Sequence, residues 1–217
     1  MFRIKICGVT RPEDVRLVAN SGADSIGLNF YERSVRYVNP EVARSMVEEL
    51  PSNIARVGVF VNASSAAIQA IARTVGLSYC QLHGDEPPEI VAELADWRVI
   101  RAVRCRAADV DTVRRWIDDC YAAEGKLAGL LVDAYQPGQY GGTGAVADWS
   151  LLAEFRRHLG DLPLILAGGL TPDNVAQAIQ VARPFAVDTA SGVESAPGIK
   201  DAEKIARFVA AAQNAWQ

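Results

Sequence analysis

A cysteine and an aspartate each end a short apolar run of this sequence, and these two residue types can together carry proton transfer. Cys7 ends RIKIC and is followed by Gly8, whereas Asp133 ends LAGLLVD. A thiolate can act as a nucleophile or a base, and a carboxylic acid can donate a proton. Taken singly, such a cysteine is more often a packing residue, and such an aspartate can cap a helix. The fold that positions the two residues therefore decides whether they form a site.

Two glycine-containing stretches closer to the C-terminus have the composition of phosphate-binding loops. AGGLTPDN contains Gly168 and Gly169, and DTASGVESAPG contains Ser191 and Gly192. Glycines let backbone amides approach a ligand, and the start of a following helix adds partial positive charge. One such loop could simply turn the chain, but two in adjacent units favour phosphate binding. A third glycine-rich stretch, 134–147, fits a lid and an ordinary surface loop equally well.

The elements that must position these residues alternate regularly along the chain. Apolar runs of strand length are predicted at 3–7, 25–30, 56–61, 78–82, 98–103, 127–133, 163–167 and 185–189. Amphipathic helices are predicted at 12–20, 40–50, 64–75, 87–95, 108–122, 148–158, 172–181 and 201–212. This alternation predicts an α/β protein, a single (β/α)8 TIM barrel domain over residues 1–217, with an open doubly wound sheet as the alternative. In a barrel, Cys7 and Asp133 would both lie at the mouth formed by the carboxyl ends of the strands, where function is expected.

Composition excludes several classes of function. The chain has 217 residues and a formal net charge of −4, which gives no support to nucleic-acid binding. It contains no apolar run of the roughly 18 residues needed to cross a membrane and no apolar stretch typical of a signal peptide, so we expect a cytoplasmic protein. Cysteines lie far apart, and with two histidines they make a poor metal or disulfide set, so we expect no metal site and four free thiols: Cys7, Cys80, Cys105 and Cys120. All but Cys7 are interpreted as packing residues.

Over essentially its whole length the chain resembles the phosphoribosylanthranilate isomerases of tryptophan biosynthesis. The resemblance rests on an ordered set of stretches: KICGVT, GLNFYERSVRYV, VGVFVN, QLHGDE, RAVR, LLVDA, YGGTG, LAGGLTPDNV and VDTASGVESAPGIKD. It implies an Amadori rearrangement without a cofactor, in which N-(5-phosphoribosyl)anthranilate becomes 1-(2-carboxyphenylamino)-1-deoxyribulose 5-phosphate. The implied partner is therefore a small phosphosugar, with no nucleic acid or membrane, and we expect a monomer rather than a homodimer.

The same resemblance implies a role for each candidate residue. Asp133 is the general acid that protonates the furanose ring oxygen, and Cys7, as a thiolate, removes the C2′ proton. Arg36 holds the anthranilate carboxylate, and Asp188 lies near the ribose hydroxyls. The implied phosphate site consists of Gly168, Gly169, Ser191 and Gly192. Because a free thiol has a pKa of about 8.5, we hypothesise that the site lowers the pKa of Cys7.

Three other functions are consistent with parts of this pattern. The histidine-pathway isomerase of the same barrel type would be expected to carry an aspartate where this chain has Cys7. A barrel that binds a phosphorylated ligand without catalysis would need neither Cys7 nor Asp133. A Schiff-base aldolase needs a lysine at a strand end, and Lys5 is predicted not to supply it because it lies two residues before the end of its strand. His83, at another strand end, could border the site, but it is interpreted as structural because no role follows from its position.

Overall fold

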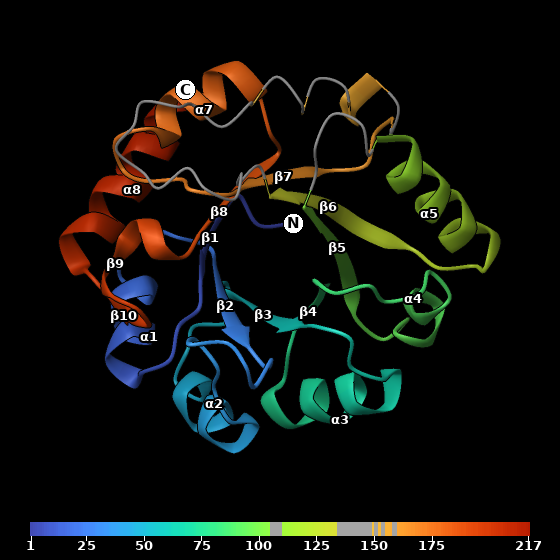
Figure 1. The fold of residues 1–217 in the computed structure, drawn as a ribbon. Coiled ribbons are helices and arrows are strands. Elements are labelled where there is room, and N and C mark those ends of the chain that lie inside the picture. Colours follow the sequence, from blue (N-terminus) through green and yellow to red (C-terminus); the bar gives the residue numbers. More distant parts are fainter. Residues whose placement is uncertain (105–109, 134–148, 150–151, 153–154, 158–159) are drawn as a thin grey trace.

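The structure, a computed structural model, is a ring of eight parallel strands with helices around its outside (Figure 1). It describes all residues except 105–109, 134–148, 150–151, 153–154 and 158–159. The strands are β1 (Ile4–Cys7), β2 (Ser25–Asn29), β3 (Ala55–Phe60), β4 (Tyr79–Leu82), β5 (Arg98–Arg104), β6 (Leu127–Asp133), β7 (Leu164–Ala167) and β8 (Ala186–Thr189). They pair in sequence order, and β8 pairs with β1 to close the ring. The predicted barrel is confirmed, and the open sheet is wrong.

Helices that begin at recognisable local signals cover the outside of the ring. They are α1 (Pro12–Ala19), α2 (Pro40–Val47), α3 (Ser65–Val75), α4 (Ile90–Glu93), α5 (Val110–Ala122), α7 (Val175–Ala182) and α8 (Ala202–Ala215). Side chains of Asn39, Ser64 and Asp201 accept backbone N–H groups in the first turns of α2, α3 and α8, which stabilises these helix starts. Most of the helix predicted at 148–158 lies outside the described residues.

Two predicted helices are shorter than the sequence pattern indicated. The helix predicted at 87–95 is helical only over Ile90–Glu93, after the consecutive prolines Pro87 and Pro88, which supply no backbone N–H. The helix predicted from residue 172 begins at Val175 instead. There the Asn174 side chain accepts the backbone N–H of Thr171 at 2.8 Å, so the chain makes a turn before the helix begins.

Side chains along each strand alternate between the barrel interior and the surrounding helices. An outer apolar cluster that includes Ile4, Ile6 and Leu28 packs beneath the helices. A separate inner cluster comprises Phe2, Val57, Tyr79, Ile100, Ala102, Leu131, Ile165, Ala167 and Ala186. Polar and ionisable side chains occupy the interior at the carboxyl ends of the strands, including Lys5 and Cys7. The period of two along a strand therefore places Lys5 and Cys7 on the same inward face.

The chain after β8 forms elements that the sequence pattern did not predict. A short 3-10 helix, η2 (Ser191–Val193), leads into an antiparallel hairpin of β9 (Glu194–Ala196) and β10 (Ile199–Lys200). The hairpin pairs Lys200 with Glu194, and both residues are buried. It lies beside α1 at the rim of the barrel (Figure 1).

Candidate active site

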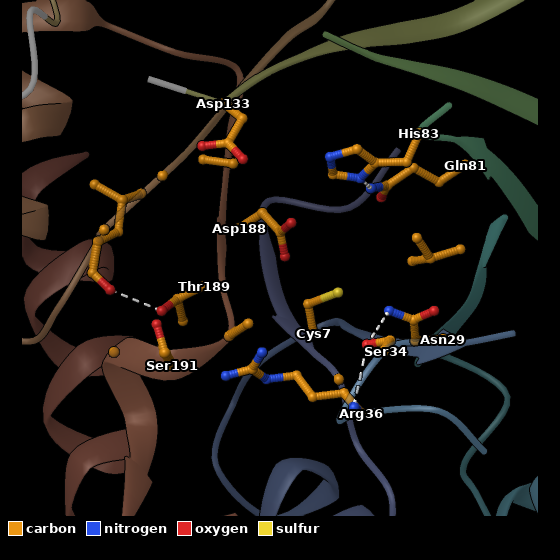
Figure 2. Close-up of a pocket in the computed structure, with 18 of the residues that line it drawn as sticks. Cys7, Asn29, Ser34, Arg36, Gln81, His83, Asp133, Asp188, Thr189 and Ser191 are labelled. Carbon is orange, nitrogen blue, oxygen red and sulfur yellow. Dashed lines mark hydrogen bonds between the residues drawn. The ribbon is translucent and has the colours of Figure 1, made fainter. Parts of the chain in front are cut away.

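A pocket of about 280 Å³ opens at the carboxyl ends of the strands. Every site residue predicted from the sequence lines it: Cys7, Arg36, Asp133, Gly168, Gly169, Asp188, Ser191 and Gly192. Figure 2 shows the Cys7 and Asp133 side chains directed into this pocket from the ends of β1 and β6. The barrel thus brings together residues that are up to 185 positions apart in the sequence, counting from Cys7 to Gly192.

Two glycines make room for the chain and the thiol at the end of β1. Gly8 has φ +71°, and a Cβ there would lie 2.4 Å from Cδ of Arg36. Gly27 is the register partner of Cys7 on β2, and a Cβ at Gly27 would lie 2.7 Å from the Cys7 Sγ. Gly8 therefore permits the left-handed turn after the strand, and Gly27 leaves the space that the thiol occupies.

Lys5 forms a buried ion pair beneath the pocket that the sequence-based reasoning did not foresee. Its side chain is fully buried inside the barrel, and its Nζ donates to Asp188 Oδ1 at 3.0 Å. Burial would lower the pKa of Lys5, but Asp188 and Cys7 outweigh burial and raise it, so the ammonium stays charged. As predicted, Lys5 lies two residues before the end of β1 and does not itself line the pocket, but it contacts Asp188, which does.

The direction of the pKa shift of Cys7 differs from the hypothesis based on the sequence. Burial raises the pKa of the Cys7 thiol, and the nearby Asp188 carboxylate raises it further. The Lys5 ammonium opposes both effects but does not outweigh them. In this structure the pKa of Cys7 is thus raised, whereas the hypothesis from the sequence was that it is lowered.

Arg36 is held by a buried carboxylate on the hairpin after β8. Its Nε and Nη2 donate to Glu194 Oε1 and Oε2, both at 2.7 Å. Lys200 Nζ donates to Glu194 Oε1 at 2.8 Å. Ser34 Oγ accepts the backbone N–H of Arg36 at 3.1 Å and so fixes the loop that carries it. Because Glu194 occupies the Nε–Nη2 edge of the guanidinium, the Nη1 edge is the one left to a ligand in the pocket.

The two glycine-containing loops after β7 and β8 pack directly against each other. Gly168 and Gly169 both have positive φ, at 94° and 64°. Thr189 Oγ1 donates to the Leu170 backbone oxygen at 2.7 Å, which joins the loops (Figure 2). A Cβ at Gly192 would lie 1.9 Å from that same Leu170 oxygen. Only glycine fits at position 192, so the close approach of these loops depends on it.

Other pocket residues were missed by the sequence-based reasoning. Gln81 and His83 both line the pocket from the end of β4, so His83 borders the site. Asn29, at the end of β2, lines it as well. The signal that could have found Gln81 is its spacing of two residues from His83, since that spacing places both side chains on one face of a strand.

The remaining predictions concern cysteines, metals and membranes. Cys80 and Cys120 are fully buried packing residues, as expected, and burial raises the pKa of Cys80 to about 12. Cys105 and the stretch 134–147 lie outside the described residues. Within the described part of the chain, no group of three or more histidine, cysteine, aspartate or glutamate side chains could hold a metal ion. No described helix is long and apolar enough to cross a membrane.

A closed ring of parallel strands with a polar pocket at their carboxyl ends defines a (β/α)8-barrel enzyme that acts on a small molecule. The family model of N-(5′-phosphoribosyl)anthranilate isomerase matches residues 4–211. The chain belongs to this family, as the resemblance implied.

Individual relatives match over nearly the full length of both chains. N-(5′-phosphoribosyl)anthranilate isomerase of Thiobacillus denitrificans is 45% identical over 97% of this chain and 98% of its own. The crystal structure of phosphoribosyl anthranilate isomerase from Thermotoga maritima is 41% identical, with a TM-score of 0.86, and the match covers 99% of this chain and 100% of that one. A structure of the isomerase in complex with reduced 1-(o-carboxyphenylamino)-1-deoxyribulose 5-phosphate is 39% identical, with a TM-score of 0.83 and the same coverage.

Proposed function

We propose that the chain isomerises N-(5′-phosphoribosyl)anthranilate with Asp133 as the general acid and Cys7 as the general base. The observation that carries this assignment is that both side chains point into one pocket, beside the glycine-containing loops after β7 and β8. An acid and a base on one substrate are what the ring opening and proton removal of this rearrangement require.

The proposed reaction rearranges the substrate by proton transfers and needs no added reactant. Asp133 gives its proton to the furanose ring oxygen, the C1′–O bond breaks, and the nitrogen lone pair forms a C1′=N iminium. The Cys7 thiolate then takes the C2′ proton, and those electrons form an enolamine. A proton moves from the enol oxygen to solvent or a base, C1′ gains a proton, and the C2′ ketone results. The product is an isomer of the substrate, so no cofactor is consumed.

The same pocket offers a place for each end of the substrate. The loops after β7 and β8 would hold the phosphate with Gly168, Gly169, Ser191 and Gly192. The Nη1 edge of Arg36 would hold the anthranilate carboxylate. Asp188, oriented by Lys5, would lie near the ribose hydroxyls. The Lys5 ammonium also favours the thiolate of Cys7 over the thiol, which partly offsets the effect of burial on the base.

A coupled fluorescence assay tests this proposal. The substrate is made in place from anthranilate, phosphoribosyl pyrophosphate and a transferase, and the loss of its fluorescence is followed after the protein is added. We expect Cys7→Ser and Asp133→Asn each to lower kcat by roughly 10²–10⁴-fold. The control Asp96→Asn makes the same change at an exposed carboxylate away from the pocket and should leave kcat unchanged.

Each outcome of this assay has a distinct meaning. Turnover that survives both site substitutions contradicts the roles of Cys7 and Asp133 but keeps the reaction. A folded wild-type protein that binds the product but never turns over substrate favours the barrel that binds without catalysis.

We further propose that residues 1–217 form one cytoplasmic domain that is a monomer in solution. One cooperative unfolding transition would support the single domain, and recovery in the cytosolic fraction of source cells would support the location. Light scattering should give a mass near 23.4 kDa. Because a solved Thermotoga maritima relative is described as dimeric, a mass twice as large is the specific result that would contradict the monomer.

A further inference from the structure

Two polar side chains at the carboxyl end of β4, Gln81 within the strand and His83 just after it, form a pair that the mechanism above does not use. The Gln81 amide nitrogen lies 3.1 Å from Nδ1 of His83. Gln81 is 1% exposed, and Figure 2 shows both side chains directed into the pocket. Gln81 Oε1 and His83 Nε2 are both buried and have no hydrogen-bond partner among the described residues. Buried polar atoms are normally paired, so these two atoms point to a ligand.

The hydrogen bond within the pair defines which ring nitrogen carries the proton. An amide nitrogen can only donate, so Nδ1 of His83 must accept, and the proton of a neutral ring lies on Nε2. Burial, followed by the nearby cations of Arg104, Lys5 and Arg101, lowers the pKa of His83 to about 4. Arg101 is itself paired with Glu86. The ring is therefore neutral at physiological pH, with an N–H donor at Nε2.

We propose that Gln81 is a positioning residue that fixes the Nε2–H tautomer of His83, and that the pair binds substrate through one donor and one acceptor. His83 Nε2–H donates, and Gln81 Oε1 accepts. This inference rests on the proposed function, because the substrate it binds is the one named there. A phosphate fits poorly, since its oxygens would face the Gln81 oxygen. A ligand that carries an N–H or O–H group next to an oxygen acceptor fits the pair well.

The position of His83 favours two groups of the substrate as the ligand atoms that the pair binds. The anilino N–H would donate to Gln81, and the ortho carboxylate would accept from His83. His83 lines the 280 Å³ pocket and also an adjoining hollow of about 710 Å³, whose walls include Tyr31, Val61 and Val103. The sugar phosphate would fill the pocket and the aromatic ring would fill the hollow. The nitrogen that links these two parts of the substrate would therefore lie beside His83, at the border between the two cavities. A neutral imidazole also avoids placing a positive charge beside the nitrogen that becomes an iminium.

Nitrogen NMR of 15N-labelled protein tests the tautomer without any substrate. The chain has only two histidines, His83 and His158, so His158→Gln assigns the signals. We expect the Nε2–H tautomer for His83, with no protonation between about pH 5 and 8. An Nδ1–H tautomer, or a ring that titrates in this range, would overturn the proposal.

Two separate ligands distinguish the part of the substrate that the pair recognises. We expect anthranilate to shift the His83 Nε2–H signal and ribose 5-phosphate to leave it in place. A shift with ribose 5-phosphate alone would place a ribose hydroxyl on the pair and reject the assignment to the anilino nitrogen. No shift with either compound would reject binding by the pair.

Substitution of Gln81 tests its positioning role. Gln81→Glu replaces the amide donor with a carboxylate that accepts from Nδ1–H, so the tautomer should reverse and a new ionisation should enter the pH profile. We expect kcat/KM to fall roughly 10- to 100-fold, mainly through KM. Gln180→Glu makes the same change at an exposed position on α7 and is the matched control. A Gln81→Glu protein with the tautomer, KM and pH profile of the wild type would overturn the role.

Substitution of His83 keeps the proposal testable if the Gln81 variant fails to fold. His83→Gln retains an amide N–H near the position of Nε2 and should keep more activity than His83→Leu, which has no donor. Equal KM values for these two variants would contradict donation by His83. Absence of turnover in the wild type would reject the proposed function instead, whereas the tautomer is measured without turnover.

Discussion

The buried cluster that holds Arg36 makes a quantitative prediction for Glu194→Gln. Glu194 has 4% side-chain exposure and lies between two cations, Lys200 at 0% and Arg36 at 24%. A glutamine oxygen at the Oε1 position could still accept from Arg36 Nε and Lys200 Nζ. Its amide group would then face Arg36 Nη2, so two donors would oppose each other, and the buried Lys200 ammonium would lose its counter-charge.

Breaking one partner of a buried ion pair costs about 3–5 kcal/mol, because the remaining charge stays buried without compensation. Most of this lost stability should come from the pair with Lys200, because Arg36 is partly exposed and solvent screens its interaction with Glu194. For a chain of this size, that loss lowers Tm by roughly 6–20 °C. We also expect a higher KM, because Arg36 is no longer held in one orientation.

Urea unfolding followed by circular dichroism measures the free energy of unfolding of Glu194→Gln and wild type. Asp173→Asn is the matched control, because it removes a carboxylate from an exposed ion pair with Arg207 and should cost less than about 1 kcal/mol. If Glu194→Gln unfolds within 1 kcal/mol of the wild type, roughly the cost of an exposed pair, the cluster does not stabilise the fold as argued. A KM unchanged in that variant would separately contradict the orientation of Arg36 by Glu194.

Three further predictions follow from contacts in the same region. Lys5→Met should raise the pKa of Cys7 further, since Lys5 now lowers it, so alkylation of Cys7 by iodoacetamide should move to higher pH. Gly192→Ala should raise KM about tenfold or more, because its Cβ would meet the Leu170 oxygen and push the phosphate loops apart. Burial alone would raise the pKa of Glu194, but hydrogen bonds from Arg36 and Lys200 outweigh it and lower this pKa below its ordinary value of 4.5. Its contribution to stability is therefore complete above about pH 4.5 and is lost as pH falls through the folded-state pKa, which urea midpoints at falling pH will measure.

Controls for these three predictions come from the chain itself. Lys126→Met removes an exposed lysine and should leave the alkylation profile of Cys7 unchanged. An unaltered profile in Lys5→Met would contradict the electrostatic coupling between Lys5 and Cys7. A Gly192→Ala protein with wild-type KM and wild-type inhibition by inorganic phosphate would refute the fit of the two loops. For the pH series, a stability difference between wild type and Glu194→Gln that stays constant below pH 4.5 would contradict the lowered pKa of Glu194.

Much of the fold was determined by local sequence. Apolar runs such as LAGLLVD and PLILA predicted strands within one or two residues of where they lie, because a strand buried on both faces needs a continuous apolar run. The helices predicted from residues 64 and 201 begin within one residue of those positions, where the Ser64 and Asp201 side chains accept N–H groups of the first turn. Repetition of the unit then indicated a barrel, and the barrel placed Cys7 and Asp133 at one mouth.

Only the tertiary structure decided how the site residues are paired and charged. Lys5 and Asp188 are 183 positions apart, and Arg36 and Glu194 are 158 apart, so no local pattern could reveal either ion pair. The hairpin after β8 brings Glu194 and Lys200 together although neither strand exceeds three residues. The direction of the Cys7 pKa shift likewise depended on burial and on charges from β1 and β8. Sequence determines which residues end each strand, because that is local, whereas closure of the ring determines which distant groups share their environment.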